Sequence, residues 1–185
     1  YMENAGYTDV RAAVAENLNR RFGTKFTAHN LIMTVGAAGG LNIIFKTILD
    51  PGDEVIVFAP FFGEYRQYAA NFDAEIVAVN PDLETFQPDL ADFEAKITAK
   101  TKALIVNTPN NPTGVIYKPK TMEQIGAILE KKQAEFGRDI YLISDEPYRE
   151  LVYDGNREDF LTKYYKNTIV GYSFSKSLSL PGERI

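Results

Sequence analysis

The sequence predicts an α/β protein of three layers, in which a mostly parallel β-sheet lies between two layers of helices. The first observation is a set of short, nearly continuous apolar segments, at 54–58, 75–79, 103–107, 140–144 and 168–170. The second is that stretches with apolar residues at helical spacing precede or separate these segments. Strands of this kind are typical of parallel sheets that helices cover on both faces. A chain of 185 residues, 45% of them hydrophobic, is long enough to bury such a core as one domain.

At the amino-terminal end, apolar residues four positions apart predict a helix that ends before Gly23. These residues are Val10, Val14, Leu18 and Phe22. Thr8 or Asp9 is suited to cap the first turn, because a side-chain oxygen there accepts hydrogen bonds from unpaired backbone N–H groups. The mainly apolar residues 31–35 are predicted to form a strand.

A glycine-rich turn at 36–40 is predicted to open the second helix, which ends at the turn 50–52. One face of this helix carries Leu41, Ile44, Phe45, Ile48 and Leu49. Because the start of a helix has unpaired N–H groups and a partial positive charge, it can bind an anion such as a phosphate group. Two further helices are predicted, a short one over 90–97 and a longer one between Pro119 and Phe136.

The stretch 172–184 contains the residues best suited to chemistry. Lys176 lies among serine residues, and Arg184 follows it eight positions later. A neutral lysine amine forms a Schiff base with a carbonyl compound, and burial favours the neutral form. The hydroxyl groups of Ser173 and Ser175, together with an arginine, are suited to hold a phosphate monoester. This combination suggests pyridoxal phosphate as a cofactor, and the alternative is an ordinary lysine on a solvated loop.

Two more polar clusters directly follow predicted strands, Thr-Pro-Asn-Asn-Pro-Thr-Gly at 108–114 and Asp-Glu-Pro-Tyr at 145–148. Ligands of parallel sheets bind beyond the carboxyl ends of the strands, so these clusters are predicted to meet the 172–184 stretch there. The motifs at 110–114, 144–148 and 173–184 resemble the signature segments of the fold type I pyridoxal-phosphate aminotransferases, the aspartate aminotransferase superfamily. The resemblance covers nearly the whole chain and keeps the order of the motifs.

This resemblance implies a set of site residues. Lys176 would bind pyridoxal 5′-phosphate as a Schiff base, and Asp145 would keep its ring nitrogen protonated. Asn111 and Tyr148 would bond to its phenolic oxygen, and Phe62, unless it is an ordinary core residue, would stack on its ring. The phosphate group would be held by Gly36, Ala37, Ala38, Ser173, Ser175 and Arg184. Many relatives carry a hydroxyl group where Ala37 stands, so here the backbone would serve. The implied catalytic residues are Lys176, Asp145 and Tyr148.

The implied function is an aminotransferase, with the aspartate type favoured, that moves an amino group from an amino acid to a 2-keto acid. Two alternatives stay open on the sequence. A lyase or an aminocyclopropanecarboxylate synthase-like enzyme would use the same cofactor and the same residues. The third possibility is the aminotransferase-like sensing domain of a transcription regulator.

The opening segment 1–6 resembles the family segment in which a tyrosine reaches the cofactor phosphate of the neighbouring subunit. We therefore expect a homodimer with a shared active site, in which Tyr1 is the residue that crosses. The resemblance also implies that residues 1–185 are the large cofactor-binding domain, a fragment without its N-terminal arm and C-terminal small domain.

Composition excludes several other classes of protein. The net charge is −5 and basic residues do not cluster, which disfavours a nucleic-acid partner. The chain has no cysteine and a single histidine, His29, so disulfides and Cys/His zinc sites are excluded and no metal site is expected. No apolar run approaches the roughly 20 residues that span a bilayer, and no signal peptide opens the sequence. A cytoplasmic location without a membrane partner is the resulting expectation.

Overall fold

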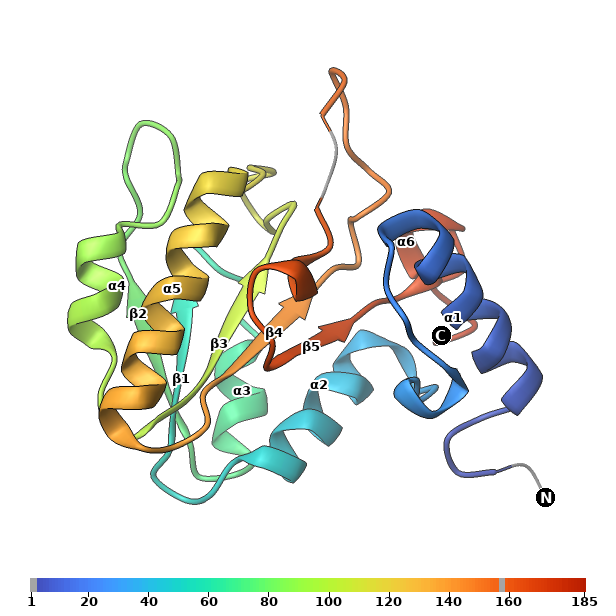
Figure 1. Ribbon diagram of the computed structural model, residues 1–185, viewed down its shortest axis with the longest axis horizontal. Helices are drawn as coiled ribbons and strands as arrows, with labels where there is room; N and C mark the ends of the chain where they lie inside the picture. The colour runs from blue at the N-terminus through green and yellow to red at the C-terminus, as the bar shows by residue number, and fades with distance from the viewer. Residues whose placement is uncertain (1–2, 157–158) are drawn as a thin grey trace.

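The computed structural model describes residues 3–156 and 159–185 of the chain. Its centre is a five-stranded sheet in which every pair of neighbouring strands is parallel, in the order β2-β1-β3-β4-β5 (Figure 1). The strands are β1 (Glu54–Phe58), β2 (Glu75–Val79), β3 (Thr101–Asn107), β4 (Tyr141–Asp145) and β5 (Thr168–Gly171). The predicted α/β class and its parallel sheet are therefore confirmed.

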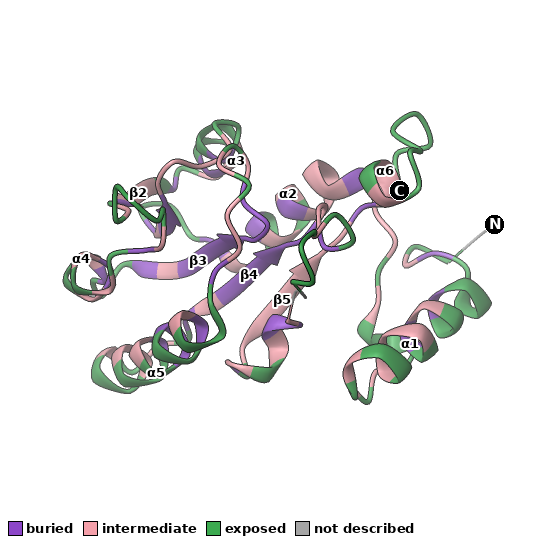
Figure 2. Cartoon of the chain, turned by 90° about the horizontal axis from the view of Figure 1, so that it is seen from above, coloured by how far each residue is buried: buried purple, intermediate pink, exposed green. Residues whose placement is uncertain are grey.

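Helices cover both faces of the sheet, as the view from above shows (Figure 2). On one face lie α2 (Gly36–Ile48) and α3 (Tyr65–Ala70), and on the other α4 (Leu90–Lys96) and α5 (Pro119–Phe136). Each face has its own hydrophobic core, with Phe45 and Tyr65 at the centre of one and Phe93 and Leu129 in the other. Burial on both faces is the reason that the central strands lack polar alternation.

Helix α1 (Thr8–Phe22) lies beyond β5, apart from the two helical layers (Figure 1). It ends as predicted, at Gly23 in a left-handed conformation with φ 68°. The predicted cap was wrong, because the helix includes Thr8, whose hydroxyl instead donates to Glu3 at 3.0 Å. The predicted apolar face was also wrong in part, since Val10 is exposed while Arg11 is buried. Polar contacts hold this part of the helix, as the Arg11 guanidinium donates to the carbonyl oxygens of residues 6 and 28.

Residues 31–35 do not form the predicted strand. They follow a short 3-10 helix, η1 (Ala28–Asn30), and form neither a helix nor a strand, and Ile32 and Val35 are exposed. A strand requires a neighbouring strand for its hydrogen bonds, and among the described residues the recorded backbone bond of Met33 N goes to Ala5 O, at 3.0 Å, outside any strand. The local sequence is suited to a strand, but the described chain supplies no strand beside it.

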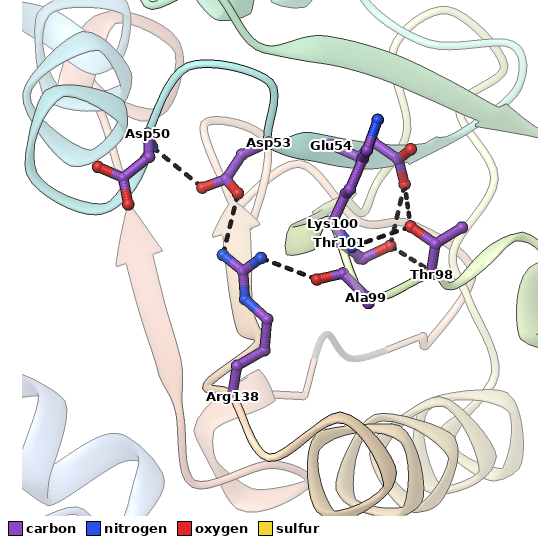
Figure 3. A network of polar contacts seen from close by, with 8 residues as sticks. All are labelled: Asp50, Asp53, Glu54, Thr98, Ala99, Lys100, Thr101 and Arg138. Atoms are coloured by element: carbon purple, nitrogen blue, oxygen red, sulfur yellow. Dashed lines mark hydrogen bonds and ion pairs between the residues drawn. The ribbon is translucent and has the colours of Figure 1, made fainter.

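A polar network joins the loops at the amino-terminal ends of the strands (Figure 3). Arg138 donates from Nη2 to the Asp53 carboxylate at 2.9 Å and from Nη1 to Ala99 O at 2.8 Å. Thr98 donates to the Glu54 carboxylate at 2.6 Å. These contacts link the segments that lead into β1, β3 and β4, so they fix the sheet at the end opposite to the polar clusters predicted above.

The chain ends with a second 3-10 helix, η2 (Leu161–Lys163), strand β5, and the short helix α6 (Phe174–Ser177). In the ranges that the structure describes, no helix combines the length and the apolar character needed to cross a membrane.

Candidate active site

A cavity of about 350 Å³ lies at the carboxyl-terminal ends of the strands, where the sequence predicted a site. The parallel arrangement explains this position, because Asn107 ends β3, Asp145 ends β4, and Ser173 follows β5 by two residues. The predicted site residues that line the cavity are Ala37, Ala38, Phe62, Asn111, Asp145, Tyr148, Ser173, Ser175, Lys176 and Arg184. Gly36 lies next to one of them, Arg184, and the predicted residue Tyr1 falls outside the described residues.

Asp145 is a buried carboxylate whose two oxygens have different surroundings. Oδ2 accepts a hydrogen bond from the Tyr65 hydroxyl at 2.5 Å, whereas the buried Oδ1 has no hydrogen-bond partner among the described residues. Burial raises the pKa of Asp145 to about 6, although the Tyr65 hydrogen bond lowers it, and the charge of Glu146 raises it further. A buried acceptor without a donor is costly, so Oδ1 is the atom of this cavity that most favours a ligand with an N–H group.

Tyr65 is a site residue that the sequence analysis missed. Its side chain is buried, and burial, together with the nearby Asp145 carboxylate, raises the pKa of its phenol well above the ordinary value. Its ring also packs edge-on against Phe62, with the ring centroids 5.6 Å apart. The only signal in the sequence was its place in the aromatic stretch, three residues after Phe62, where α3 begins.

Asn107, a second missed residue, connects the ends of two neighbouring strands. Its Nδ2 donates to the backbone oxygen of Asp145 at 2.8 Å, and its Oδ1 accepts from the backbone N–H of Asn111 at 2.7 Å. Asn111 Nδ2 in turn lies 3.5 Å from the Tyr148 hydroxyl oxygen. Lys176 Nζ is 5.9 Å from the centre of the Tyr148 ring, so Asn111, Tyr148 and Lys176 face one volume.

Lys176 is the third residue of α6. The helix is capped by Ser173, whose Oγ accepts from the backbone N–H of Ser175 at 3.2 Å. Ser173 Oγ also lies within hydrogen-bond distance of Ser175 Oγ, at 2.9 Å, and of Ile185 O, at 3.0 Å, so this hydroxyl is already used by the fold. The sequence argument expected a buried lysine, but the Lys176 side chain is exposed, because α6 lies at the rim of the cavity.

Arg184 lies against the start of α2. A β-carbon placed on Gly36 would come within 2.7 Å of Arg184 Nη2, so the absence of a side chain at residue 36 makes this approach possible. The φ of Gly36 is +65°, a conformation that other residues rarely adopt. The recorded hydrogen bond of the guanidinium is a long one, from Nη1 to Pro181 O at 3.4 Å. A positive helix start and an arginine therefore meet at one point, as an anion site requires.

The residues present fit pyridoxal 5′-phosphate. Asp145 Oδ1 is an acceptor for a ring N–H group, and Asn111 and Tyr148 carry donors for a phenolic oxygen. Arg184 and the start of α2 are suited to a phosphate group that carries about −1.5 to −2 charges at neutral pH. Phe62 offers an aromatic face in the same cavity. Each polar part of that molecule therefore has a chemical counterpart in this cavity.

Comparison with known proteins gives the same result. A family model described as aminotransferase class I and II matches residues 1–185. The aspartate/prephenate aminotransferase of Thermus thermophilus is 35% identical over 187 residues, which make up 100% of this chain and 47% of that protein. The aspartate aminotransferase of Pyrococcus horikoshii is 34% identical over 187 residues, 100% of this chain and 46% of that protein. The chain thus spans about half the length of these relatives.

Solved structures agree with the sequence matches. An amino transferase from Eubacterium rectale has a TM-score of 0.98 and 50% sequence identity, over 100% of this chain and 46% of that chain. The aspartate aminotransferase from Thermus thermophilus, solved with maleate, has a TM-score of 0.91 and 34% identity, over 100% of this chain and 47% of that one. These similarities confirm the predicted three-layer fold and the predicted resemblance.

Proposed function

The chain belongs to the aminotransferase class I and II family, and on that basis we propose that it is the large cofactor-binding domain of a pyridoxal-phosphate-dependent aminotransferase. Members of this family use pyridoxal 5′-phosphate. The proposed reaction moves an amino group from an amino acid to a 2-keto acid. The names of the Thermus and Pyrococcus relatives favour substrates of the aspartate type.

One observation supports this function most strongly, the unpaired and buried Oδ1 of Asp145 in a cavity that Lys176 also lines. Burial raises the pKa of this carboxyl group to about 6, so without a partner for Oδ1 the group is half charged at about that pH. A protonated ring nitrogen would give this oxygen a charge-assisted hydrogen bond, which contributes roughly 1.5–3 kcal/mol. A merely structural carboxylate would be expected to have both oxygens hydrogen-bonded.

The bound cofactor would supply an electron sink, which makes the α-hydrogen of an amino acid acidic. Asp145 would hold the proton on the ring nitrogen, and Arg184 with the start of α2 would hold the phosphate group. Asn111 and Tyr148 would donate hydrogen bonds to the phenolic oxygen. The Lys176 amine, when neutral, would accept the α-proton of the substrate and later donate it, acting first as base and then as acid.

We further propose a homodimer with a shared site and a cytoplasmic location. Exposed apolar side chains in α2 and just before it support a partner surface, since Ile32, Val35 and Ile43 are 64%, 70% and 50% exposed. In this proposal Tyr1 binds the phosphate of the neighbouring subunit's cofactor, as its match to the family segment implies.

Transfer of labelled nitrogen tests the proposed function. The complete protein, loaded with pyridoxal phosphate, is mixed with ¹⁵N-aspartate and 2-oxoglutarate, and ¹⁵N-glutamate is measured by mass spectrometry. We expect ¹⁵N in the new amino acid, and none with Lys176→Ala, which removes the proposed proton carrier. A lyase would consume the donor without moving its nitrogen, and a sensing domain would bind without turnover. Either result, for a panel of amino acids and keto acids, would contradict the proposal.

A further inference from the structure

Arg149 and Glu146 form a buried ion pair beside the candidate site. The side chains are 5% and 0% exposed, and the Arg149 guanidinium donates from Nε and Nη2 to Glu146 Oε2. The other carboxylate oxygen, Oε1, accepts from the Ser144 hydroxyl at 2.5 Å. Burying two charges costs desolvation free energy even when they are paired, so a buried ion pair is weak evidence for stability. A role for Arg149 other than stability is therefore of interest.

Three aromatic rings surround the Arg149 guanidinium. Its central carbon lies 4.7 Å from the ring centre of Tyr172, 5.0 Å from that of Phe160 and 5.5 Å from that of Phe22. The last two rings are themselves stacked, with centroids 4.8 Å apart. These rings belong to the segment after β5, the segment before η2, and the last turn of α1. A planar guanidinium stacks on rings in a way that a lysine ammonium does not.

Arg149 is connected, through its neighbours, both to Asp145 and to Lys176. On one side, its partner Glu146 directly follows Asp145, and the backbone N–H of Glu146 donates to Gly171 O at 2.8 Å. On the other side, the Tyr172 hydroxyl donates to Ser177 Oγ at 2.7 Å, and Ser177 is the neighbour of Lys176. Contacts therefore run without a break from the end of β4, through Arg149 and Tyr172, to α6.

Helix α6 needs such a support. It has only four residues, Phe174–Ser177, and a helix this short is not stable by its own backbone hydrogen bonds. Its orientation therefore depends on side-chain contacts at its two ends, the Ser173 cap and the bond from Tyr172 to Ser177.

We propose that Arg149 is a positioning residue that fixes Lys176 relative to Asp145 and Tyr148, acting through Tyr172 and Ser177. The inference rests on the proposed function in one respect, the assignment of Lys176 as the lysine that bonds to the cofactor. Arg149 itself is buried and is not among the residues that line the cavity, so it contacts the network instead of the reacting atoms.

The mildest test is Tyr172→Phe, which keeps the ring under Arg149 and removes the hydroxyl bonded to Ser177. In the complete protein, pyridoxal phosphate is added, borohydride stops the reaction at successive times, and the labelled Lys176 peptide is quantified. We expect the rate of attachment per folded molecule to fall about three- to tenfold, the loss that one hydrogen bond implies. Ser177→Ala, which removes the other partner, should give the same result.

The matched control is Tyr165→Phe. The Tyr165 hydroxyl donates to Ile140 O at 2.8 Å, at the other end of β4, so this variant loses the same chemical group far from the site. We expect it to lower the unfolding midpoint and to leave the attachment rate unchanged. A fall in rate equal to that of Tyr172→Phe would make the effect merely structural and would overturn the proposal.

Arg149→Lys then tests the arginine itself. It keeps a positive charge for Glu146 and loses the planar contact with Tyr172, so attachment should again slow about three- to tenfold. If Arg149 and Tyr172 act along one path, the double variant that carries Arg149→Lys and Tyr172→Phe should attach the cofactor little more slowly than the slower single variant. A double variant whose attachment rate falls by the product of the two single reductions would overturn the proposed path. Should Arg149→Lys fail to fold, Tyr172→Phe and Ser177→Ala decide, since normal rates in both would overturn it.

A cofactor-free measurement separates this inference from the proposed function. Amide hydrogen exchange of the peptide that contains α6 should be faster in Tyr172→Phe than in the wild type, and unchanged in Tyr165→Phe. Wild-type protein that carries no label on Lys176 would refute the proposed function. Unchanged exchange of α6 in Tyr172→Phe would refute the positioning role, whatever the cofactor does.

Discussion

Replacing Asp145 with asparagine is expected to stabilise the protein once the cofactor has been removed. In the empty cavity, burial raises the pKa of this carboxyl group from 3.8 to about 6. Its Oδ1 has no partner among the described residues, so the charged form is poorly solvated there. A difference of roughly two pKa units corresponds to about 3 kcal/mol, since one unit is worth about 1.36 kcal/mol.

The sign of the effect follows from which state binds the proton more tightly. Because the folded-state pKa lies above the unfolded value, the contribution of Asp145 to stability is fully present below the unfolded pKa, near 3.8, and is lost as the pH rises through about 6. Asparagine does not ionise, so the stability of the variant does not fall in this way as the pH rises. The variant should therefore gain stability relative to the wild type as the pH rises.

Urea unfolding of both cofactor-free proteins, at about pH 5 and about pH 8, measures this difference. We expect the free energy of unfolding of Asp145→Asn to exceed that of the wild type by a margin that widens by roughly 1.5 kcal/mol between these pH values, the part of the loss that remains above about pH 5. With pyridoxal phosphate bound, the order should reverse, because the charged carboxylate then has its partner. A margin that does not change with pH would refute the assignment of Asp145 as a buried acid with one unpaired oxygen.

Two further predictions concern the phosphate end of the cavity. Arg184→Ala should weaken cofactor affinity at least tenfold, because charge-assisted hydrogen bonds contribute roughly 1.5–3 kcal/mol each, and an unchanged dissociation constant would remove Arg184 from the site. Gly36→Ala should also weaken affinity, by about tenfold on the same reasoning, since its β-carbon would meet Arg184 Nη2 at 2.7 Å. Its control is Gly23→Ala, which has a similar φ of +68° with no atom within 4 Å of the added carbon, and which should leave affinity unchanged. Equal losses in both glycine variants would mean that backbone strain alone is responsible.

Much of the fold could be predicted where a local sequence pattern has clear ends. The predicted bounds of β1, β2 and α5 are those of the structure, since turn-forming residues such as Pro119 and Gly137 delimit α5. Helix α3 was not predicted, because six residues in an aromatic stretch are too few to show a period. Residues 31–35 have the composition of a strand, but a strand forms only by pairing with another segment, and pairing is not a local property.

The site could be predicted where a motif lies at the end of a strand. Asn111, Asp145 and Lys176 come together because the carboxyl ends of parallel strands share one edge of the sheet. Tyr65 was missed because its role depends on a hydrogen bond to a residue 80 positions away. Arg149 was missed for a similar reason, since its contacts come from α1, from the segment before η2 and from the segment after β5.

The central claim is that Lys176 is the residue that bonds to the cofactor. The most direct test is to load the complete protein with pyridoxal phosphate, reduce it with borohydride so that the bond becomes permanent, and map the labelled peptide by mass spectrometry. We predict one label for each chain, on Lys176. A label on Lys102, Lys118 or any other lysine, with Lys176 unmodified, would contradict the account.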